Sequence, residues 1–352
     1  MRALVLSGGE GSRLRPLTHT SAKQLIPVAG TPILFFALEA IRDAGITEVG
    51  IVVGATGDEV RAAVGDGSRW GLSTTYISQP APLGLAHAVL TAADFVRGEP
   101  FLMYLGDNVL LEGVTRFVED FERARPDAQI FLARVPEPER FGVAVLDGER
   151  VVRLVEKPKG SVSDLALVGV YLFDDSILEA AATLRPSWRG EYEITEAIQW
   201  LVDHGRRVRA QMVEGWWKDT GRPEDLLEAN RMMLSVCAHR IDGEIDPESR
   251  VEGVVVVGAG AKVIRSELVG PVVIGPGTVI EDSVIGPNVS IERDSRVVRS
   301  TIDDSIVMEG GEISWVHRLS GSILGRDVEI RHSGRAGVHR LVVGDQSHLE
   351  VD

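Results

Sequence analysis

Residues 8–28, GGEGSRLRPLTHTSAKQLIPV, place bare glycine backbone and several cations directly after an apolar opening segment. The glycines are Gly8, Gly9 and Gly11, and the cations that flank them are Arg13, Arg15 and Lys23. Glycine lets backbone N–H groups approach phosphate oxygens closely, and mobile cations beside such donors suit a triphosphate whose outer part leaves as diphosphate. A glycine-rich turn with solvated charges would give the same residues, so this run alone leaves both interpretations open.

Two familiar phosphate-binding loops can be tested against this run. A Walker loop requires Gly-Lys-Ser/Thr after four intervening residues, and residues 8–28 do not contain it. A dinucleotide fingerprint requires a third glycine at the position of Leu14, so that pattern fails as well. The run is therefore a phosphate loop of another kind, or only a turn.

Asp107 stands where a carboxylate could bind a metal ion, and a second carboxylate, Asp219, appears later in the chain. Asp107 follows the apolar segment FLMYL of residues 101–105, and Asp219 lies in the run WWKDTG of residues 216–221. A carboxylate at the carboxyl end of a buried strand, beside a phosphate loop, is a natural Mg²⁺ ligand. Asp107 could equally cap the turn that follows it, and the tryptophans near Asp219 could be ordinary core aromatics.

Short apolar segments alternate with helical patterns through the first two thirds of the chain, and they predict the elements that position these groups. The expected buried strands are residues 4–6, 51–53, 101–105 and 130–135. Residues 31–45, TPILFFALEAIRDAG, carry apolar side chains at helical spacing. Thr31 is the expected N-cap, Pro32 the first helical residue and Gly45 the C-terminal cap. This rhythm predicts an α/β fold with a mostly parallel sheet, whose ligands bind at the carboxyl ends of the strands.

Beyond about residue 245 the helical spacing disappears, and apolar residues recur every 17 positions. The three registers are Val257, Ile274, Ile291 and Met308; Val263, Ile280 and Val297; and Leu268, Ile285, Ile302 and Leu319. Coils of this length with three inward apolar residues are typical of a parallel β-helix, in which each coil buries its apolar side chains against the next. An antiparallel β-sandwich is the alternative, although a sandwich rarely keeps a fixed period. The pattern loosens past residue 310, and Leu324-Gly325 and Val343-Gly344 indicate that it resumes.

Length and composition set outer bounds on the protein. A chain of 352 residues exceeds one ordinary core, so we expect two domains, residues 1–240 and 241–352. The absence of an 18-residue apolar run argues against a membrane span, and the net charge of −15 disfavours nucleic acid as a partner. The one cysteine, Cys237, excludes an intrachain disulfide, and the N-terminal apolar run is too short for a signal peptide. We therefore expect a cytoplasmic location.

The run GGEGSRLRPLT followed by KQLIPV resembles the signature of the sugar-1-phosphate nucleotidylyltransferases, G-G-x-G-[ST]-R-L-x-P-x-T and K-x-L-x-P-V. More narrowly, the chain is similar to the long-form glucose-1-phosphate thymidylyltransferases of bacterial deoxysugar pathways, and the resemblance covers nearly its whole length. It implies a Rossmann-like nucleotidyltransferase domain followed by a C-terminal left-handed parallel β-helix. It also implies that a thymidylyl group passes from dTTP to α-D-glucose 1-phosphate by direct in-line attack with Mg²⁺, giving dTDP-glucose and pyrophosphate.

The resemblance also implies roles for individual residues. The nucleotide would contact Leu6, Gly8, Gly9, Gly11, Ser12, Arg13, Gln79, Pro82, Gly84 and Asp107. The sugar phosphate would contact Gly142, Glu156, Lys157, Gly169, Tyr171 and Trp217. The catalytic residues would be Arg13, Lys23, Asp107 and Asp219, and the two aspartates would share one Mg²⁺ ion.

Residue chemistry supports some of these roles and limits others. Gln79 offers an amide donor and acceptor to a base edge, but thymine and uracil present the same edge. Lys157 could reach a sugar phosphate as a point charge, and Glu193 could bond a sugar hydroxyl. Phe141 stands where many relatives have tyrosine, so any contact that those relatives make through the tyrosine hydroxyl is absent in this chain. His87 is expected to be packed or to face its helix and not to be catalytic.

Other functions stay open. UTP could replace dTTP, and another hexose 1-phosphate could replace the glucose ester. The β-helix could carry an acyltransferase, for which His317, His332 and His339 are available, although none lies in a recognisable motif. A nucleotide-sugar-binding paralogue without activity is a third possibility, but such a protein need not keep all the charges of a reacting centre. Because an exposed coil end is a sheet edge, we expect the β-helix to build a homo-oligomer.

Overall fold

The structure is a computed structural model that describes residues 1–332 and 337–351, and the chain packs into two compact units. The first unit holds Met1–Glu10 and Leu34–Asp219; the second holds Gly11–Ile33 and the described residues from Thr220 onward. The chain therefore passes from one unit to the other within the glycine-rich run. The domain division expected at residue 240 follows the sequence pattern and stays a prediction.

A nine-stranded sheet forms the centre of the first unit, in the order β5-β4-β1-β6-β11-β8-β12-β10-β9. Its strands are β1 (Arg2–Ser7), β4 (Glu48–Val53), β5 (Ser73–Ser78), β6 (Phe101–Leu105), β8 (Ala128–Arg134), β9 (Gly142–Asp147), β10 (Arg150–Glu156), β11 (Leu165–Phe173) and β12 (Val208–Met212). The first four strands in this order are parallel, as are β8 and β12, whereas β9, β10 and β11 add antiparallel pairs. The expected α/β fold and its four strands are confirmed.

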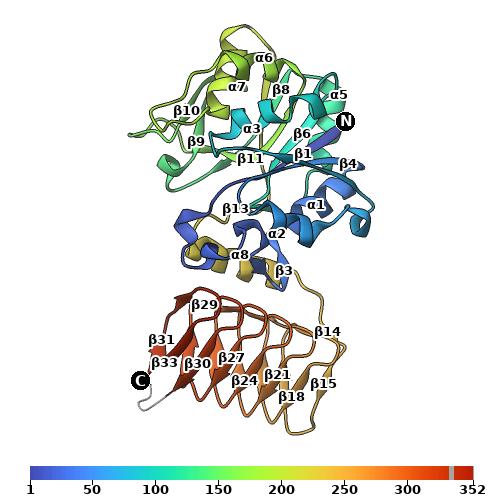
Figure 1. Cartoon of the computed structure of the whole chain (residues 1–352). Coiled ribbons are helices and arrows are strands. Elements are labelled where there is room, and N and C mark those ends of the chain that lie inside the picture. The colour runs from blue at the N-terminus through green and yellow to red at the C-terminus, as the bar shows by residue number, and fades with distance from the viewer. Residues whose placement is uncertain (333–336, 352) are drawn as a thin grey trace. The chain divides into compact units, whose positions relative to one another are not determined.

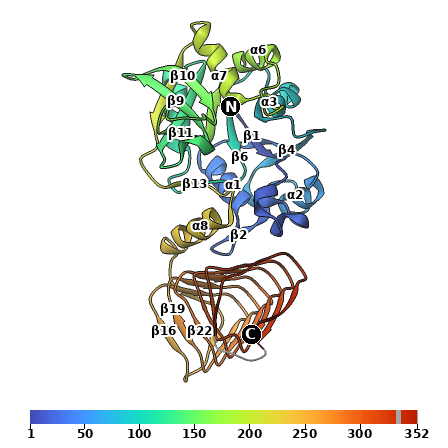
Figure 2. The same ribbon diagram turned by 90° about the vertical axis from the view of Figure 1, so that its left-hand side faces the viewer.

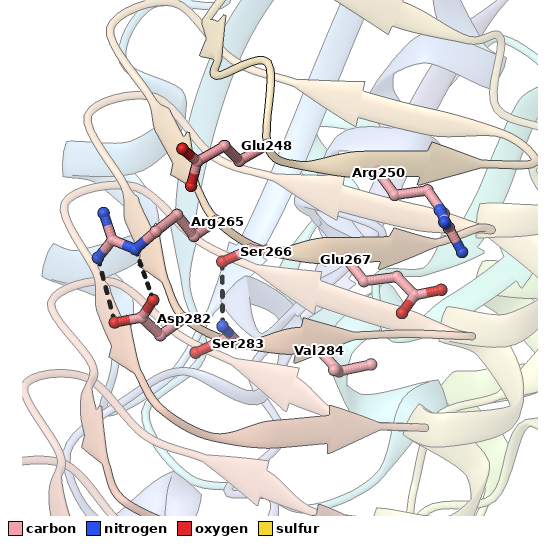
Figure 3. Close-up of a pocket in the computed structure, with 8 residues that line it drawn as sticks. All are labelled: Glu248, Arg250, Arg265, Ser266, Glu267, Asp282, Ser283 and Val284. Carbon is pink, nitrogen blue, oxygen red and sulfur yellow. Dashed lines mark hydrogen bonds and ion pairs between the residues drawn. The ribbon is translucent and has the colours of Figure 1, made fainter.

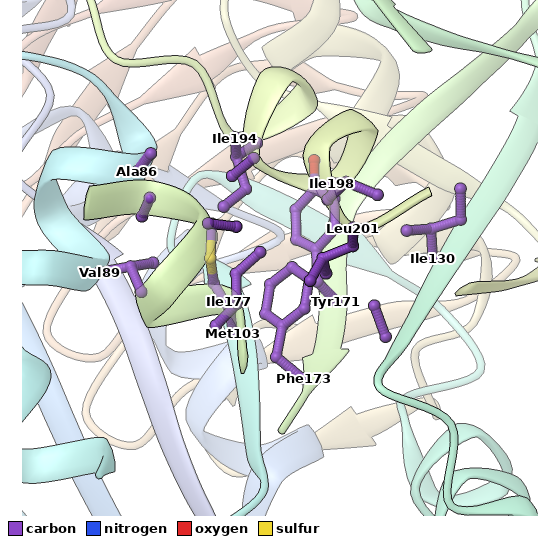
Figure 4. Packing of buried hydrophobic residues seen from close by; sticks show 14 of the residues in the cluster. Ala86, Val89, Met103, Ile130, Tyr171, Phe173, Ile177, Ile194, Ile198 and Leu201 are labelled. Atoms are coloured by element: carbon purple, nitrogen blue, oxygen red, sulfur yellow. The ribbon is translucent and has the colours of Figure 1, made fainter. Parts of the chain in front are cut away.

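Helices cover both faces of this sheet. The helices of the first unit are α1 (Ile33–Asp43, which begins in the second unit), α2 (Gly57–Val64), α3 (Leu85–Thr91), α4 (Ala93–Val96), α5 (Thr115–Ala124), α6 (Ser176–Thr183) and α7 (Ile194–Asp203). Ile130 packs with Ile198 and Tyr171 in the cluster under α3, α6 and α7 (Figure 4). The next residue, Phe131, points to the other face, where it stacks on Phe117 of α5 with 4.0 Å between ring centroids. No helix among the described residues is both long and apolar enough to span a bilayer.

The predicted helix at residues 31–45 is present, but it begins later than expected. Thr31 and Pro32 form β3 (Thr31–Pro32), which pairs with β2 (Pro27–Val28), and α1 therefore starts at Ile33. The turn between β2 and β3 engages the backbone of Thr31, so Thr31 is not an N-cap. The end of α1 is as expected, because Gly45 has φ of +76° and donates its N–H to the carbonyl of Arg42.

Three parallel sheets build the C-terminal part of the second unit, and among the described residues each coil except the last gives one strand to each sheet (Figures 1 and 2). The first sheet holds β14 (Arg240–Ile241), β17 (Val255–Val257), β20 (Val272–Ile274), β23 (Val289–Ile291), β26 (Ile306–Val307), β29 (Ile323–Leu324) and β32 (Val342–Val343). The second holds β15 (Glu244–Ile245), β18 (Lys262–Ile264), β21 (Val279–Glu281), β24 (Arg296–Val298), β27 (Glu312–Ser314), β30 (Glu329–His332) and β33 (His348–Val351). The third holds β16 (Arg250–Glu252), β19 (Glu267–Val269), β22 (Val284–Ile285), β25 (Thr301–Asp303), β28 (Arg318–Ser320) and β31 (Val338–His339). This is the arrangement of the expected left-handed parallel β-helix, and parallel pairing excludes the sandwich.

The 17-residue registers match the strand pairing with one exception. Val257 pairs with Ile274 and Ile274 with Ile291, as the spacing predicts. Ile291 then pairs with Val307 and not with Met308, so the predicted fourth member of that register is wrong. The corner that contains Asp304 is one residue shorter than the equivalent Gly-Pro-Asn corner of the coil before it, which shifts the register. The resumption at Leu324 is confirmed, because this residue pairs with Val343.

Buried serines link the coils of the β-helix to one another. Ser266 Oγ donates to the carbonyl of Ile264 and accepts the N–H of Ser283 one coil further on, at 3.0 Å (Figure 3). Ser283 repeats this pattern towards Ser300 at 3.1 Å. Each hydroxyl therefore has a donor and an acceptor role, which satisfies a polar group that would otherwise be costly to bury. We name the chain Ser249, Ser266, Ser283 and Ser300 the serine ladder.

We expect the buried carboxyl group of Glu292 in the β-helix to make stability depend on pH. Burial, and next the charge of Glu309, raise the pKa of Glu292 to about 7. The folded state then binds a proton that the unfolded state releases, so stability is fully present below about pH 4.5 and falls as pH rises through about 7. The variant Glu292→Gln should therefore be more stable than wild type at pH 8, by up to about 3 kcal/mol, and by less than about 1 kcal/mol at pH 5.

Urea denaturation at pH 5 and pH 8 measures this difference. Glu312→Gln, at an exposed position of β27, is the control and should show no such pH dependence. An equal effect of Glu292→Gln at both pH values would contradict the expectation.

Candidate functional site

The glycine-rich run begins where β1 ends, and there it meets two neighbouring strand ends of the first unit. A Cβ atom added to Gly54, which follows β4, would lie 2.7 Å from the carbonyl oxygen of Gly8. A Cβ atom added to Gly8 would lie 3.1 Å from Oε1 of Gln79, which follows β5. Gly9 is exposed, whereas Leu6 is buried in β1 and accepts the N–H of Gly106 at 3.0 Å. Bare backbone therefore lies at the carboxyl end of the parallel strands, where the sequence predicted it.

The second half of the run belongs to the second unit and folds on itself. Gly11 has φ of +64°, and a Cβ atom there would lie 2.9 Å from Cγ2 of Thr18 and 3.0 Å from Cβ of Lys23. Thr18 also donates its hydroxyl to the carbonyl of Gly11 at 2.7 Å. Three short 3₁₀ helices follow: η1 (Ser12–Leu14), η2 (Leu17–His19) and η3 (Lys23–Leu25). Arg13 is exposed on η1, and the stem of Lys23 packs against the glycine.

A hydrogen-bond network fixes the orientation of the Gln79 amide. Its Nε2 atom donates to the carbonyl of Gly84 at 3.3 Å and lies 2.9 Å from Nδ1 of His87. His87 lies on α3, so the helix holds the amide that the sequence assigned to the base. Sequence reasoning gave His87 no role, and the eight-residue spacing to Gln79 offered no signal for this contact.

Gly84 lies at a place where only glycine fits. Its φ is +103°, and an added Cβ atom would lie 2.5 Å from the carbonyl oxygen of Tyr192. The backbone of Tyr192 donates to Leu83 O at 2.7 Å and accepts from Ala86 N at 3.0 Å, which fastens the loop. Pro82 is exposed on the same loop.

Two short strands bring the predicted aspartates together. β7 (Asn108–Leu110) pairs antiparallel with β13 (Trp217–Asp219), and the register places Asp219 opposite Asn108. Asp107 precedes Asn108 directly and is 8% exposed. Asp107 thus lies directly before β7 and Asp219 at the end of the paired strand β13, although the sequence separates them widely.

Asn108 is a residue of this site that the sequence did not single out. Its Nδ2 atom donates to Asp107 Oδ1 at 3.1 Å, and its Oδ1 atom accepts the indole N–H of Trp217 at 2.7 Å. Gly169 has φ of +74°, and a Cβ atom there would lie 2.9 Å from Asn108 Nδ2. Gly169 thus leaves room for the amide, and the amide holds Asp107.

A second cluster contains Glu156 and Lys157, two of the residues that were assigned to the sugar phosphate. Glu156 Oε1 lies 3.9 Å from Lys157 Nζ and 3.4 Å from Nη1 of Arg189. Arg189 also binds Glu193 at 3.1 Å and Glu191 at 2.7 Å, so one guanidinium joins three carboxylates. Sequence reasoning missed Arg189, and the only signal was its place in the acidic run RGEYE.

The environment of Glu156 perturbs its protonation. Burial raises the pKa of Glu156 most, and the negative charge of Glu193 raises it further, whereas Lys157 and Arg189 act in the opposite direction. Thr195 Oγ1 donates to Glu156 Oε2 at 3.2 Å. A bound polyol that displaced water here would meet a carboxylate already held by its neighbours.

Aromatic contacts connect the two clusters. The Phe141 ring lies edge-on to Trp217 with 5.5 Å between centroids. The ring of phenylalanine therefore contacts Trp217 although this side chain lacks the hydroxyl of tyrosine. Gly142 follows it, and a Cβ atom there would lie 2.5 Å from Cγ2 of Thr195 and 3.0 Å from Glu156 Oε2. Side-chain bulk at Gly142 would therefore push on the carboxylate.

The structure places Tyr171 and Glu193 away from open surface. Tyr171 stacks with Phe173 inside the hydrophobic cluster and is 3% exposed, and burial raises the pKa of its hydroxyl (Figure 4). Glu193 is also buried, and it accepts the Ser187 hydroxyl at 2.9 Å in addition to Arg189. Glu193 shares Arg189 with Glu156, and direct sugar contacts from Tyr171 and Glu193 stay predictions.

The histidines considered for an acyltransferase lie apart in the β-helix. His317 is exposed before β28, His332 ends β30 and His339 lies on β31, which belongs to another sheet than β30. Nothing among the described residues places them in one arrangement with the site above.

Comparisons with known proteins place this site in context. Residues 2–236 match the family described as nucleotidyl transferase. The chain is 53% identical to the glucose-1-phosphate thymidylyltransferase of Streptomyces griseus and 51% identical to that of Streptomyces antibioticus, in both cases over 100% of this chain and 99% of the relative. It is also 43% identical, over the full length of both chains, to a low-salt glycan biosynthesis nucleotidyltransferase of Haloferax volcanii.

Solved structures resemble the chain over about two thirds of its length. One is a Bacillus anthracis protein assigned as a glucose-1-phosphate thymidylyltransferase and solved with sucrose, which has a TM-score of 0.64 and 33% identity and covers 68% of this chain and 98% of that chain. A UDP-glucose pyrophosphorylase complexed with UDP-glucose has a TM-score of 0.61 at 23% identity, which shows a shared fold.

Gly84→Ala should destabilise the first unit and disturb the Gln79 loop. An alanine Cβ would meet the Tyr192 backbone, so we expect a loss of about 3 kcal/mol in the free energy of unfolding. Gly98→Ala is the matched control, because Gly98 also has positive φ but has no atom within 4 Å of the added Cβ. It should cost only about 1 kcal/mol. Equal losses in urea denaturation would show that backbone conformation, and not the Tyr192 contact, sets the cost.

Proposed function

Because this chain belongs to the nucleotidyl transferase family, we propose that it transfers a thymidylyl group from dTTP to α-D-glucose 1-phosphate. A phosphate oxygen of the sugar ester attacks the α-phosphorus, the bond to the β-phosphate breaks, and dTDP-glucose and diphosphate result. The full-length match to thymidylyltransferases is the observation that carries this proposal. The paired strands that bring Asp107 and Asp219 together support it from the structure.

The protein's task in such a reaction is alignment and charge neutralisation, because two anions must meet. In the proposed mechanism the backbone of Gly8 and Gly9 faces the triphosphate, and Gln79 reads the base edge. Arg13 and Lys23 hold the diphosphate end and stabilise it as it leaves. The chain's net charge of −15 repels anions in general, so these local cations must attract the substrate.

The donors at Asp107 and Asp219 fit Mg²⁺, which takes few protein carboxylates and completes its shell with water and phosphate oxygens. Among the described residues no group of three or more His, Cys, Asp or Glu side chains could hold a metal. When bound there, the ion would supply positive charge to the phosphates of both substrates. Asn108 keeps Asp107 in position for this role through its 3.1 Å hydrogen bond.

The sugar phosphate would lie at the second cluster. Lys157 and Arg189 supply positive charge, and Glu156 supplies an acceptor for sugar hydroxyls. Trp217 lies between this cluster and Asn108, and its indole is fixed by the 2.7 Å bond to that amide. We further propose a cytoplasmic homo-oligomer, supported by the single cysteine and by the unpaired edges of β14, β15 and β16.

Diphosphate release from wild-type protein with Mg²⁺ tests the function. Each of dTTP and UTP is paired with each member of a hexose 1-phosphate panel, and the nucleotide sugar is identified by mass. Preference for dTTP with the glucose ester is expected. Preference for UTP would mean that the base is uracil and not thymine. Binding of a nucleotide sugar without release of diphosphate from any pair would indicate a non-enzymatic paralogue. Thiol release from acetyl-CoA with sugar phosphates would reveal an acyltransferase.

Asp107→Asn should lower kcat about 100-fold or more, because a neutral amide cannot supply the carboxylate charge at the reacting centre. Initial rates at saturating Mg²⁺ and both substrates measure this. Asp94→Asn, on the exposed side of α4, is the control and should keep the wild-type rate. Wild-type turnover by Asp107→Asn would remove Asp107 from the mechanism.

Lys157→Ala should raise KM for glucose 1-phosphate about tenfold and leave KM for dTTP unchanged, because the lost charge faces only the sugar phosphate. Lys262→Ala, on an exposed β-helix position, controls for the loss of a surface cation. A selective rise in KM for dTTP would mean that the two pockets are assigned the wrong way round.

A further inference from the structure

The cation-bearing segment Gly11–Ile33 shares its compact unit with the β-helix, although the two are far apart in sequence. The same unit contains α8 (Pro223–Ser235), which follows the first unit in the chain. Nothing in the proposed mechanism uses the β-helix. Its contacts with the segment therefore need their own explanation.

The last coil of the β-helix binds the middle of the segment through one carboxylate. Asp345 Oδ2 accepts the hydroxyl of Thr20 at 2.7 Å and that of Ser21 at 3.2 Å. Its other oxygen, Oδ1, accepts the backbone N–H of Arg326 at 2.8 Å, and Arg326 Nη1 donates to Ser21 Oγ at 3.2 Å. Ser21 is 3% exposed, so its hydroxyl depends on these partners and not on water.

The backbone beside Asp345 approaches the segment closely as well. A Cβ atom added to Gly344 would lie 3.1 Å from the carbonyl oxygen of Pro16. A Cβ atom added to Gly325 would lie 2.6 Å from Oδ1 of Asp345 itself. Both glycines thus permit the arrangement that puts the carboxylate against Thr20.

A second anchor lies several coils earlier. Asn230 of α8 accepts the N–H of Ala29 at 2.8 Å and the hydroxyl of Ser290 at 2.9 Å through the same oxygen. Its Nδ2 atom donates to the carbonyl of Asn288 at 3.3 Å. Asn230 is 1% exposed, and it therefore ties the end of the segment to the corner of a β-helix coil.

We propose that the β-helix holds segment Gly11–Ile33 in its nucleotide-binding conformation, with Asp345 as a positioning residue. Two anchors, at Thr20 and Ser21 and at Ala29, enclose the part of the segment that contains Lys23. Ser21 is two residues before Lys23, whose Cβ packs on Gly11. Loss of the Asp345 anchor frees this packing and with it the cation. The inference rests on the proposed function only in that the segment's ligand is the nucleoside triphosphate.

The test compares full-length Asp345→Ala with Asp303→Ala. Asp303 is a matched control, because it also accepts from a serine hydroxyl, that of Ser320, and from an arginine, Arg318. Among the described residues it makes no hydrogen bond to segment Gly11–Ile33. Asp345→Ala should raise KM for dTTP about tenfold and change KM for glucose 1-phosphate less than twofold. Asp303→Ala should leave both constants within about twofold of wild type.

Hydrogen exchange supplies a readout that needs no activity. Amides of residues 11–33 should exchange about tenfold faster in Asp345→Ala than in wild type or Asp303→Ala. Unchanged exchange and unchanged KM for dTTP in folded Asp345→Ala would overturn the inference. So would an equal rise in both KM values, because that is the result of general destabilisation.

A second variant keeps the test decisive where Asp345→Ala does not fold. The double variant Thr20→Val with Ser21→Ala removes the same bonds from the segment's side, and it should reproduce the rise in KM for dTTP. Wild-type KM in that variant would overturn the inference. Failure of wild-type protein to release diphosphate would instead reject the proposed function, while the exchange measurement still decides whether Asp345 orders the segment.

Discussion

The antiparallel pairing of β7 with β13 places Asp219 opposite Asn108, the residue that follows Asp107, and the surrounding side chains are arranged around that pairing. Asn108 faces Asp107 with its amide nitrogen and Trp217 with its amide oxygen, so rotation of the amide would break both bonds. Asn108 thereby links the side chain of Asp107 to β13, the strand that carries Asp219.

At the proposed sugar side, several carboxylates surround one positive charge. Arg189 is held by Glu156, Glu191 and Glu193, and this fixes its guanidinium before any ligand arrives. Side chains that are already ordered lose less entropy on binding than mobile ones. The acidic composition of the chain and its affinity for anions are therefore compatible, because the cations that matter are few and immobilised.

Periodicity predicted the fold better than it predicted the site. Apolar spacing was sufficient to predict the strands and most β-helix registers, because every coil must bury apolar side chains at the same positions. It failed at Met308, where one corner of a coil is a residue shorter. The metal role of Asp107 was predicted from its place after a buried strand, whereas its pairing with Asp219 came from resemblance to a family, since no spacing rule joins residues that are related only through strand pairing. Arg189 and His87 were missed because their partners are set by tertiary structure.

The serine ladder has a consequence for how this β-helix can change length. Each hydroxyl repeats the bonding of the one before it, so a complete extra coil would continue the ladder without an unsatisfied group. Between Ser290 and Asp345, however, both anchors grip the same segment, and one added coil would displace the aspartate by roughly 4.8 Å. The number of coils between Ser290 and Asp345 is therefore fixed by the two anchors on one segment.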